Sequence, residues 1–89
     1  MIYRSTARFW RSYSRLPKTV QERAEWAFDR FQADPQHPSL RIHPLRGTDG
    51  VMAGHVTRAY VFTFRYSRAP NGERVCEFLD IGTHAIYER

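Results

Sequence analysis

The sequence predicts one α+β domain over residues 1–89, in which an N-terminal helical hairpin packs on a mostly antiparallel sheet of four to five strands. Two observations predict this class. Apolar side chains recur at helical spacing up to Ala33, whereas the remaining residues alternate with the period of strands and are divided by turn residues. A chain of 89 residues suits a single core, and 42% apolar and 15% aromatic residues argue against intrinsic disorder.

The first half of the chain predicts a short strand and two helices. The strand is expected at 2–4, with Ser5 as the cap of the following helix. That helix, at 6–16, has one apolar face, and its other face carries the cations Arg8, Arg11 and Arg15. Pro17 ends it and begins a second helix, which continues to Ala33. The two helices should form an antiparallel hairpin.

The second half predicts four strands, at 40–45, 51–58, 60–67 and 75–82. Pro44 indicates that the first of them lies at a sheet edge, and Gly54 marks a weak point or bulge in the second. The sequence Pro70-Asn71-Gly72 predicts a hairpin turn, and a short tail at 83–89 ends the chain. Because the helices cover one face of the sheet, the other face should be available for binding.

Several classes of protein are excluded by composition. A single cysteine, Cys76, allows neither an internal disulfide nor a cysteine-based zinc site. No apolar run approaches the ~18 residues of a membrane span. The first 15 residues carry four arginines and no apolar segment typical of a secretory signal. We therefore expect a cytoplasmic protein with no membrane partner and no cofactor.

Basic residues are concentrated in two blocks. The chain has 13 arginines and one lysine against nine acids, which gives a net charge of +5. Residues 1–16 contain four arginines and no acid, and residues 41–68 contain five arginines and one aspartate. This pattern predicts a positive face that suits phosphates, which arginine binds in bidentate fashion. A gene rich in GC codons would also favour arginine over lysine.

Three histidines lie in or just after different predicted strands: His43, His55 and His84. In an antiparallel sheet such positions can converge on one face. Since an unperturbed histidine titrates near pH ~6.5, two of them could divide the acid and base roles of a proton transfer. Taken singly, each could instead be a structural residue, and no HxH or HxxxH spacing supports a metal site. His37, between two prolines, is set aside.

Cations and aromatic rings surround these histidines in the sequence, namely Arg41, Arg46, Arg58, Arg65, Arg68, Tyr60 and Tyr87. Single-stranded RNA needs both, because arginine pairs with phosphates and unstacked bases lie on aromatic rings. Alternatives remain for each. Tyr60 shares a strand face with the core residues Phe62 and Phe64, Arg65 could pair across the sheet with Glu77, and the helical arginines could form a solvated surface.

Four segments resemble, in the same order, the RelE/ParE superfamily of bacterial type II toxins. The resemblance is strongest to the YafQ-like branch of that superfamily. The segments are residues 9–17, 35–40, 43–47 and 82–85. The resemblance implies a microbial ribonuclease-like fold. It also implies ribosome-dependent cleavage of translated mRNA without a metal, and an antitoxin that blocks the site. By position, His43, His55 and His84 match the active-site histidines of the branch, and Tyr60 matches an aromatic residue there.

The chain departs from this pattern at Ala59, where the branch has an acidic residue, and at Val61, where many members have arginine. Near the C-terminus, Tyr87 stands close to the position where the branch has an aromatic residue. Three readings stay open. The chain could be an active endoribonuclease, a ParE-like topoisomerase inhibitor without catalytic activity, or a catalytically degenerate RNA-binding relative.

We favour the endoribonuclease, with His43 and His84 sharing the acid and base roles and His55 and Arg65 contacting the phosphate. Tyr60 or Tyr87 would stack on or orient a base. The remaining RNA contacts would come from Arg41, Arg46, Arg58 and Arg68, and contacts to ribosomal RNA from Arg8, Arg11 and Arg15.

Overall fold

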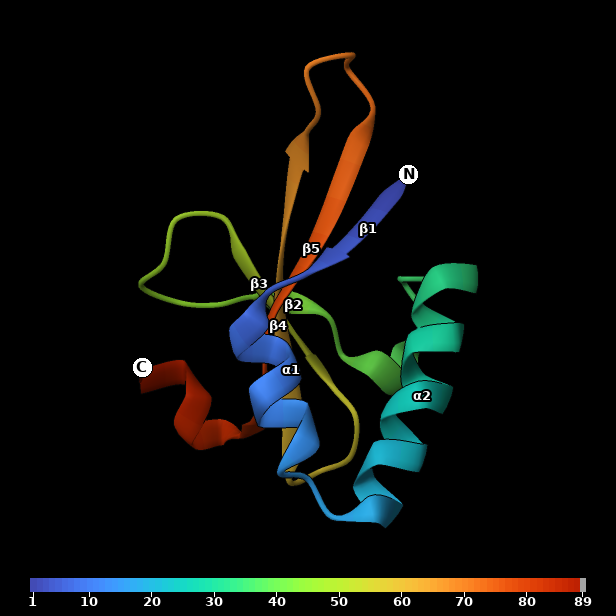
Figure 1. Cartoon of the computed structure of the whole chain (residues 1–89), viewed down its shortest axis with the longest axis vertical. Coiled ribbons are helices and arrows are strands. Elements are labelled where there is room, and N and C mark those ends of the chain that lie inside the picture. The colour runs from blue at the N-terminus through green and yellow to red at the C-terminus, as the bar shows by residue number, and fades with distance from the viewer. Residues whose placement is uncertain (89) are drawn as a thin grey trace.

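The computed structural model describes residues 1–88. Its elements are β1 (Ile2–Ser5), α1 (Ala7–Ser14), α2 (Lys18–Ala33), the 3-10 helix η1 (Pro38–Leu40), β2 (His43–Pro44), β3 (Val51–His55), β4 (Tyr60–Arg68), β5 (Arg74–Thr83) and the 3-10 helix η2 (His84–Glu88). The strands form one sheet in the order β1-β5-β4-β3-β2 (Figure 1). β1 is parallel to β5, and all other neighbours are antiparallel. The expected fold class is confirmed.

The first helix occupies the edge of β5 beyond the point where β1 ends. Its cap is Thr6 rather than the expected Ser5, since the Thr6 hydroxyl accepts a hydrogen bond from the Phe9 amide (3.0 Å). The same hydroxyl donates to the Leu79 carbonyl (2.8 Å). One turn further on, the Ser12 hydroxyl donates to Asp80 Oδ1 (2.6 Å), and both side chains are buried. These bonds fix α1 along β5.

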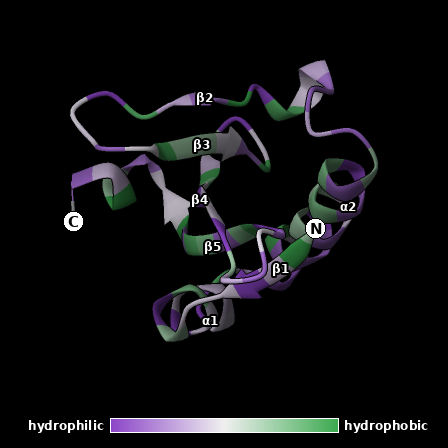
Figure 2. Ribbon diagram, turned by 90° about the horizontal axis from the view of Figure 1, so that it is seen from above, coloured by the Kyte–Doolittle hydropathy of each residue, from purple (hydrophilic) through white to green (hydrophobic). Residues whose placement is uncertain are grey.

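The second helix covers one face of the sheet. It is tied to α1 at their junction, where the Tyr13 hydroxyl donates to the Gln21 carbonyl and the Gln21 amide donates to the Tyr13 carbonyl. The expected helical hairpin is therefore present. Figure 2, viewed from above, shows α2 and the C-terminal segment on opposite sides of the sheet and α1 beside β1 and β5. No described helix is long and apolar enough to cross a membrane.

Aromatic side chains fill the space between α2 and the sheet. Phe31 from α2, Phe62 and Phe64 from β4, and Phe78 from β5 are all buried. The Phe31 ring lies edge-on to Phe64, with 5.0 Å between ring centroids, and similarly to Phe62 at 6.0 Å. Strand β4 thus buries the face that the sequence predicted for the core.

An extra residue interrupts the pairing of β5 with β4. Phe64 lies opposite Phe78 and Thr63 opposite Asp80, so Leu79 has no partner in the register. Such a bulge reverses the alternation of the strand that follows it. Ile81 consequently joins Phe78 in the core, although the two residues are an odd number of positions apart.

Two of the expected strands are shorter in the structure. Residues 40–45 were expected to form one strand, but Leu40 ends η1, and Arg41 adopts a left-handed conformation with φ 49°. Only His43–Pro44 remain paired in β2. The strand expected at 51–58 ends at His55, because the amides of the next two residues turn to the Tyr60 carbonyl (2.9 and 3.1 Å).

Gly54 is not a bulge, contrary to the expectation, because it pairs in regular register with Phe62. A methyl group built at Gly54 would lie 2.6 Å from Ile42 Cδ1 and 2.6 Å from the Phe62 ring. Ile42 and Phe62 therefore pack into the space that a side chain at Gly54 would occupy, next to His55.

The face of the sheet opposite the helices was expected to be available for binding, and the residues at 83–89 to form a short tail. Instead, η2 turns back over part of that face, where Ile86 is 5% exposed. Val61 and Thr63, which point to this face from β4, are buried, and Thr63 lines a hollow with Ile86. Residue 89 lies outside the described part of the chain.

The close packing at Gly54 predicts that Gly54→Ala destabilises the fold. The added methyl group forces Ile42 and the Phe62 ring to move, which typically costs about 1–3 kcal/mol. For a domain of this size we expect the melting temperature to fall by roughly 4–8 °C for each kcal/mol, measured by circular dichroism. Ser67→Ala, at an exposed position of the same sheet, is the control and should change stability by less than about 0.5 kcal/mol. Equal melting temperatures for the two variants would contradict the packing argument.

Candidate active site

Three histidines from separate segments form a row on the face of the sheet opposite α2. His43 lies in β2, His55 ends β3, and His84 begins η2. The ring centroids of His43 and His55 are 6.4 Å apart, and those of His55 and His84 are 5.7 Å apart. His55 pairs in register with Val61, and the next residue, Phe62, packs on α2 from the other face. The structure thus brings together the three histidines that the sequence singled out.

Backbone carbonyls orient two of these rings. His43 Nδ1 is 2.9 Å from the Arg41 carbonyl, and His55 Nδ1 is 3.3 Å from the Thr57 carbonyl. Since a carbonyl oxygen only accepts hydrogen bonds, Nδ1 of each ring carries the proton. The Nε2 atom of each neutral ring then keeps its lone pair, and it can accept a proton from a substrate.

The middle ring of the row is kept neutral by its surroundings. Partial burial lowers the pKa of His55 below the ordinary 6.5, and the nearby charges of His84, Arg41 and His43 lower it further, against an opposing contribution from the Thr57 carbonyl. Burial and like charges both penalise the protonated ring. At neutral pH, His55 is therefore available as a base.

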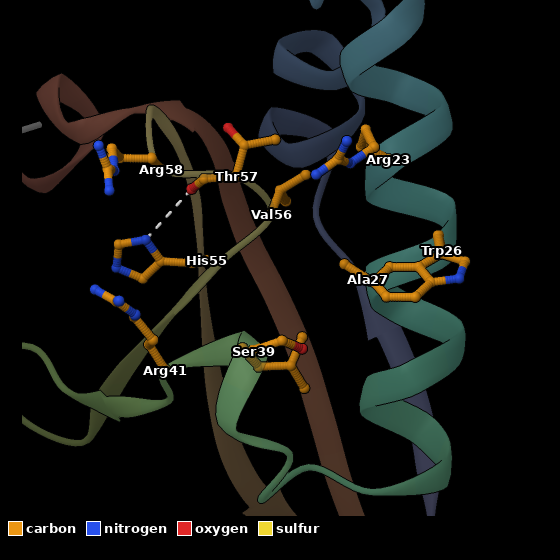
Figure 3. A pocket seen from close by; sticks show the side chains of 10 residues that line it. Arg23, Trp26, Ala27, Ser39, Arg41, His55, Val56, Thr57 and Arg58 are labelled. Atoms are coloured by element: carbon orange, nitrogen blue, oxygen red, sulfur yellow. Dashed lines mark hydrogen bonds between the residues drawn. The ribbon is translucent and has the colours of Figure 1, made fainter.

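Two arginines lie close to His55 at the rim of a cavity, which we call the α2 pocket. The cavity has a volume of about 240 Å³ and lies between α2, η1 and the turn from β3 to β4; Arg23, Trp26, Arg41, His55, Thr57 and Arg58 are among the residues that line it. Figure 3 shows Arg41, His55 and Arg58 on one side and Arg23 and Trp26 from α2 on the other. Arg41 and Arg58 are exposed, so a phosphate beside His55 can reach both.

The conformation of Arg41 contributes to this geometry. With φ 49° and ψ 45°, it is the single described residue other than glycine with a positive φ. Such a conformation costs a residue with a side chain about 1–2 kcal/mol. It ends η1 and turns the Arg41 side chain toward the histidine row.

Three of the predicted RNA-binding arginines lie away from His55. Arg65 is four residues beyond Val61 on β4, or about 13 Å along the strand, and its Nη2 atom is 3.5 Å from the Asp49 carbonyl. Arg68 lies at the β4–β5 hairpin, where it donates to the Gly72 carbonyl. Arg46 is exposed in the turn after β2. The sequence assigned the phosphate of the reaction to Arg65, but Arg41 and Arg58 lie closer to the histidines.

Tyr60 does not join the histidine row. It alternates with Val61 on β4 and lines a separate hollow with Arg15, the residue that follows α1, and Pro17. The other helical arginines assigned to ribosomal RNA, Arg8 and Arg11, are exposed as well. Tyr60 therefore lies next to Arg15 and outside the histidine row, whereas Arg8 lines a different hollow, which it shares with Tyr87.

Tyr87 extends the row instead. Its ring lies edge-on to His84, with centroids 5.5 Å apart. Its hydroxyl is buried without a hydrogen-bond partner among the described residues, and burial raises the pKa of Tyr87. Tyr87 thus packs against His84.

The contribution of α2 was not predicted from the sequence. Arg23 and Trp26 are three residues apart, which places them on one side of a helix, and both are exposed. The signal available in the sequence was a tryptophan three residues after an arginine in a predicted helix. His37, which was set aside, proves structural, since its ring nitrogens lie 2.8 Å from Arg30 Nη1 and 2.8 Å from Ser39 Oγ.

Within residues 1–88, no group of three histidine, cysteine, aspartate or glutamate side chains is arranged to hold a metal ion. No carboxylate is among the charges that act on His55, which come from His84, Arg41 and His43. The arrangement is suited to proton transfer beside a phosphate.

Known structures share this fold. The chain superposes on the YoeB/ParE toxin from Agrobacterium tumefaciens with a TM-score of 0.73 and 19% identity, covering 94% of this chain and 99% of that one. YafQ from E. coli gives a TM-score of 0.75 at 15% identity, with 94% and 93% covered. The RelE–RelB complex from Pyrococcus horikoshii gives 0.66 at 16% identity, with 92% of each chain covered.

No family model and no curated protein sequence matches the chain significantly. At such low identities the superpositions show the fold. The chain has the fold of the RelE, YafQ and YoeB toxins, as the resemblance in the sequence implied.

The surroundings of His55 predict its titration. In a proton NMR titration of the histidine rings, the pKa of His55 should lie below 6.5. Arg41→Gln removes one of the charges that disfavour the protonated ring, so it should raise this pKa. Arg68→Gln, at the far hairpin, is the control and should leave it unchanged. A pKa of His55 at or above 6.5 in the unaltered protein would show that burial and the neighbouring charges do not act as described.

Proposed function

We propose that this protein is the toxin of a toxin–antitoxin pair and that it cleaves mRNA on the translating ribosome by acid–base transesterification. The observation that carries the proposal is the row of His43, His55 and His84 beside Arg41 and Arg58. Groups that move protons and groups that bind a phosphate are thereby present within one small area. The fold that this chain shares with the solved toxin structures would not be sufficient evidence for this function, because one fold supports many activities.

The reaction begins at the 2′-hydroxyl of the RNA. His55 Nε2 takes its proton, and the 2′-oxygen attacks the adjacent phosphorus. His55 suits this role because its lowered pKa keeps it unprotonated at neutral pH. His43 on the neighbouring strand, whose Nδ1 donates to the Arg41 carbonyl, contacts a phosphate oxygen through Nε2 in its protonated form, in which both ring nitrogens are donors. These roles differ from the initial assignment, in which His43 and His84 shared the proton transfers.

The bond from phosphorus to the 5′-oxygen then breaks. His84 donates a proton to the departing 5′-oxygen, which leaves a 2′,3′-cyclic phosphate on one fragment and a 5′-hydroxyl on the other. Arg41 and Arg58 stabilise the additional negative charge that develops on the phosphate. Acid–base help contributes about 10²–10⁴-fold, and the ribosome, by holding the mRNA in place, would supply much of the remainder.

A partner antitoxin is part of the proposal. The solved YafQ and RelE structures include complexes with DinJ and RelB, and the former is described as a toxin–antitoxin complex. A bound chain of this kind would cover the exposed arginines beside the histidines. It would thus protect the cell that makes the toxin.

We expect His84→Ala to abolish most of the activity and to leave the fold intact. His84 is exposed, and its described ring contacts are with His55 and Tyr87 only. Loss of the proton donor should lower mRNA cleavage by about 10²-fold or more, measured by primer extension in a translating ribosome system. The 5′ ends of the fragments should carry hydroxyl groups.

His37→Ala is the control for this experiment. It should retain the cleavage rate, although its melting temperature should fall because the ring contacts with Arg30 and Ser39 are lost. If His84→Ala cleaves as well as the unaltered protein, the catalytic assignment is wrong. If no variant cleaves RNA and the unaltered protein inhibits a DNA topoisomerase, the chain is a ParE-like inhibitor instead.

The affinity for the antitoxin should fall as salt rises. Exposed arginines attract an acidic partner through charges that salt screens, so the dissociation constant should increase between low and physiological ionic strength. Isothermal titration with the protein encoded next to this gene measures the effect. An affinity that is independent of salt would indicate an interface dominated by apolar contacts.

A further inference from the structure

We propose that the α2 pocket is a nucleotide-binding subsite, in which the base of the mRNA nucleotide next to the cleaved one stacks on Trp26 while Arg23 and Arg58 hold its phosphate. The inference rests on the proposed function and adds to it a subsite that determines which nucleotide lies beside the cleavage point. It assigns a role to two residues of α2, Arg23 and Trp26, on the opposite side of the cavity from the histidines.

The position of the cavity connects it to the reaction. His55 belongs both to the histidine row and to the lining of the α2 pocket. A strand of RNA with its scissile phosphate at His55 can therefore continue directly into the cavity. A volume of about 240 Å³ is smaller than typical pockets for drug-sized ligands, and it suits one base and not a longer segment.

The charge of the cavity favours a phosphate. Three arginines from three different segments line it: Arg23 from α2, Arg41 from the end of η1, and Arg58 from the turn after β3. None of the described residues that line it is an aspartate or a glutamate. In Figure 3 the guanidinium group of Arg23 extends from α2 toward the turn that carries Arg58. An anion entering here meets positive charge from several sides.

Trp26 supplies a surface for a base. Its side chain is 55% exposed, which is unusual for a residue with so large an apolar ring. The guanidinium carbon of Arg30 lies 3.9 Å from the centre of the ring. Arg30 lines a neighbouring hollow, which Trp26 shares, and not the α2 pocket. One side of the indole is thus occupied by a cation, and the side that lines the α2 pocket can stack on a base.

The chain contains two tryptophans, and this allows a direct test. Trp10 is also 55% exposed but lies on α1, where its indole N–H donates to the Ser5 hydroxyl. In the Trp10→Phe protein, Trp26 is the single source of tryptophan fluorescence. The probe is a short single-stranded RNA whose 2′-hydroxyls are methylated, so that it cannot be cleaved.

We expect this RNA to quench the fluorescence of Trp26 in a saturable manner, since a base stacked on indole quenches it. In the matched Trp26→Phe protein, the fluorescence of Trp10 should stay constant. Arg23→Gln in the Trp10→Phe background should weaken binding about tenfold, as expected for the loss of a charge-assisted phosphate contact. If Trp26 is not quenched up to millimolar RNA, the subsite does not exist.

A second measurement identifies the source of the nucleotide. In the translating ribosome system, Trp26→Ala should lower cleavage by about 5- to 100-fold and change which positions of the mRNA are cut, because a stacking contact to one mRNA base is lost. Trp10→Ala should leave rate and pattern unchanged. An even loss at all positions, together with weaker binding of the variant to ribosomes without mRNA, would overturn the mRNA assignment in favour of ribosomal RNA.

The same proteins separate this inference from the proposed function. Trp10→Phe combined with His84→Ala should show the full quenching with RNA, because His84 does not line the α2 pocket. Quenching without cleavage by any variant would support the subsite and reject the nuclease. Cleavage that depends on His84, without quenching of Trp26, would support the nuclease and reject the subsite.

Discussion

The packing of Phe78 is the interaction on which the rest of the structure depends. Six aromatic rings from four other elements lie with their centroids 5.0–6.4 Å from its ring, namely Tyr3 of β1, Phe9 of α1, Phe28 and Phe31 of α2, and Phe62 and Phe64 of β4. Tilted and edge-on arrangements predominate, and each such pair contributes about 0.5–1.5 kcal/mol beyond the burial of its area. A small domain has room for few core residues. Concentrating them around one ring joins both helices and three strands at a single point.

The bulge that follows Phe78 links this core to the histidine row. Without the bulge, which leaves Leu79 unpaired, alternation along β5 would carry Asp80 into the core and Ile81 out of it. With it, Ile81 packs inward, and Asp80 meets Ser12 at the edge where α1 lies. Gly82 then falls on the face of Val61, and His84, two residues later, emerges beside His55. The bulge determines which side chains of β5 face the core. The placement of His84 therefore depends on this alternation as well as on the contacts that His84 makes.

Much of this arrangement follows from local patterns in the sequence. Helical spacing identified α1 and α2, and alternation identified β4 and β5, because these periods reflect which side chains face the core. The points at which strands end or bulge were not predicted. Nothing in its residue type distinguishes Arg41 as left-handed, and the turn after His55 contains a valine and a threonine, residues typical of strands. The bulge at Leu79 depends on tertiary packing, and so it leaves no local signal.

The candidate active site was also predicted only in part. The three histidines were found because each lies in or just after a predicted strand, where an antiparallel sheet brings neighbours together. Tyr60 was grouped with them, but strand alternation places it on the other face from Val61. Arg23 and Trp26 were not predicted, because helical spacing indicates only which side chains face the core. In the structure, α2 contributes Arg23, Trp26 and Ala27 to the lining of the α2 pocket, whereas the strands contribute His55 alone.

The attachment of α1 to β5 has a consequence for how the chain folds. The hydrogen bond from Thr6 to Leu79 joins residues 73 positions apart, and the parallel pairing of β1 with β5 is equally distant in sequence. Domains dominated by such non-local contacts fold slowly, on the scale of milliseconds to seconds, because a large loop must close before the contacts form. Since β5 also carries Phe78 and leads into His84, the core, the first helix and the histidine row should form in a single cooperative step. A partly folded chain would then contain helices and hairpins but no assembled row of histidines.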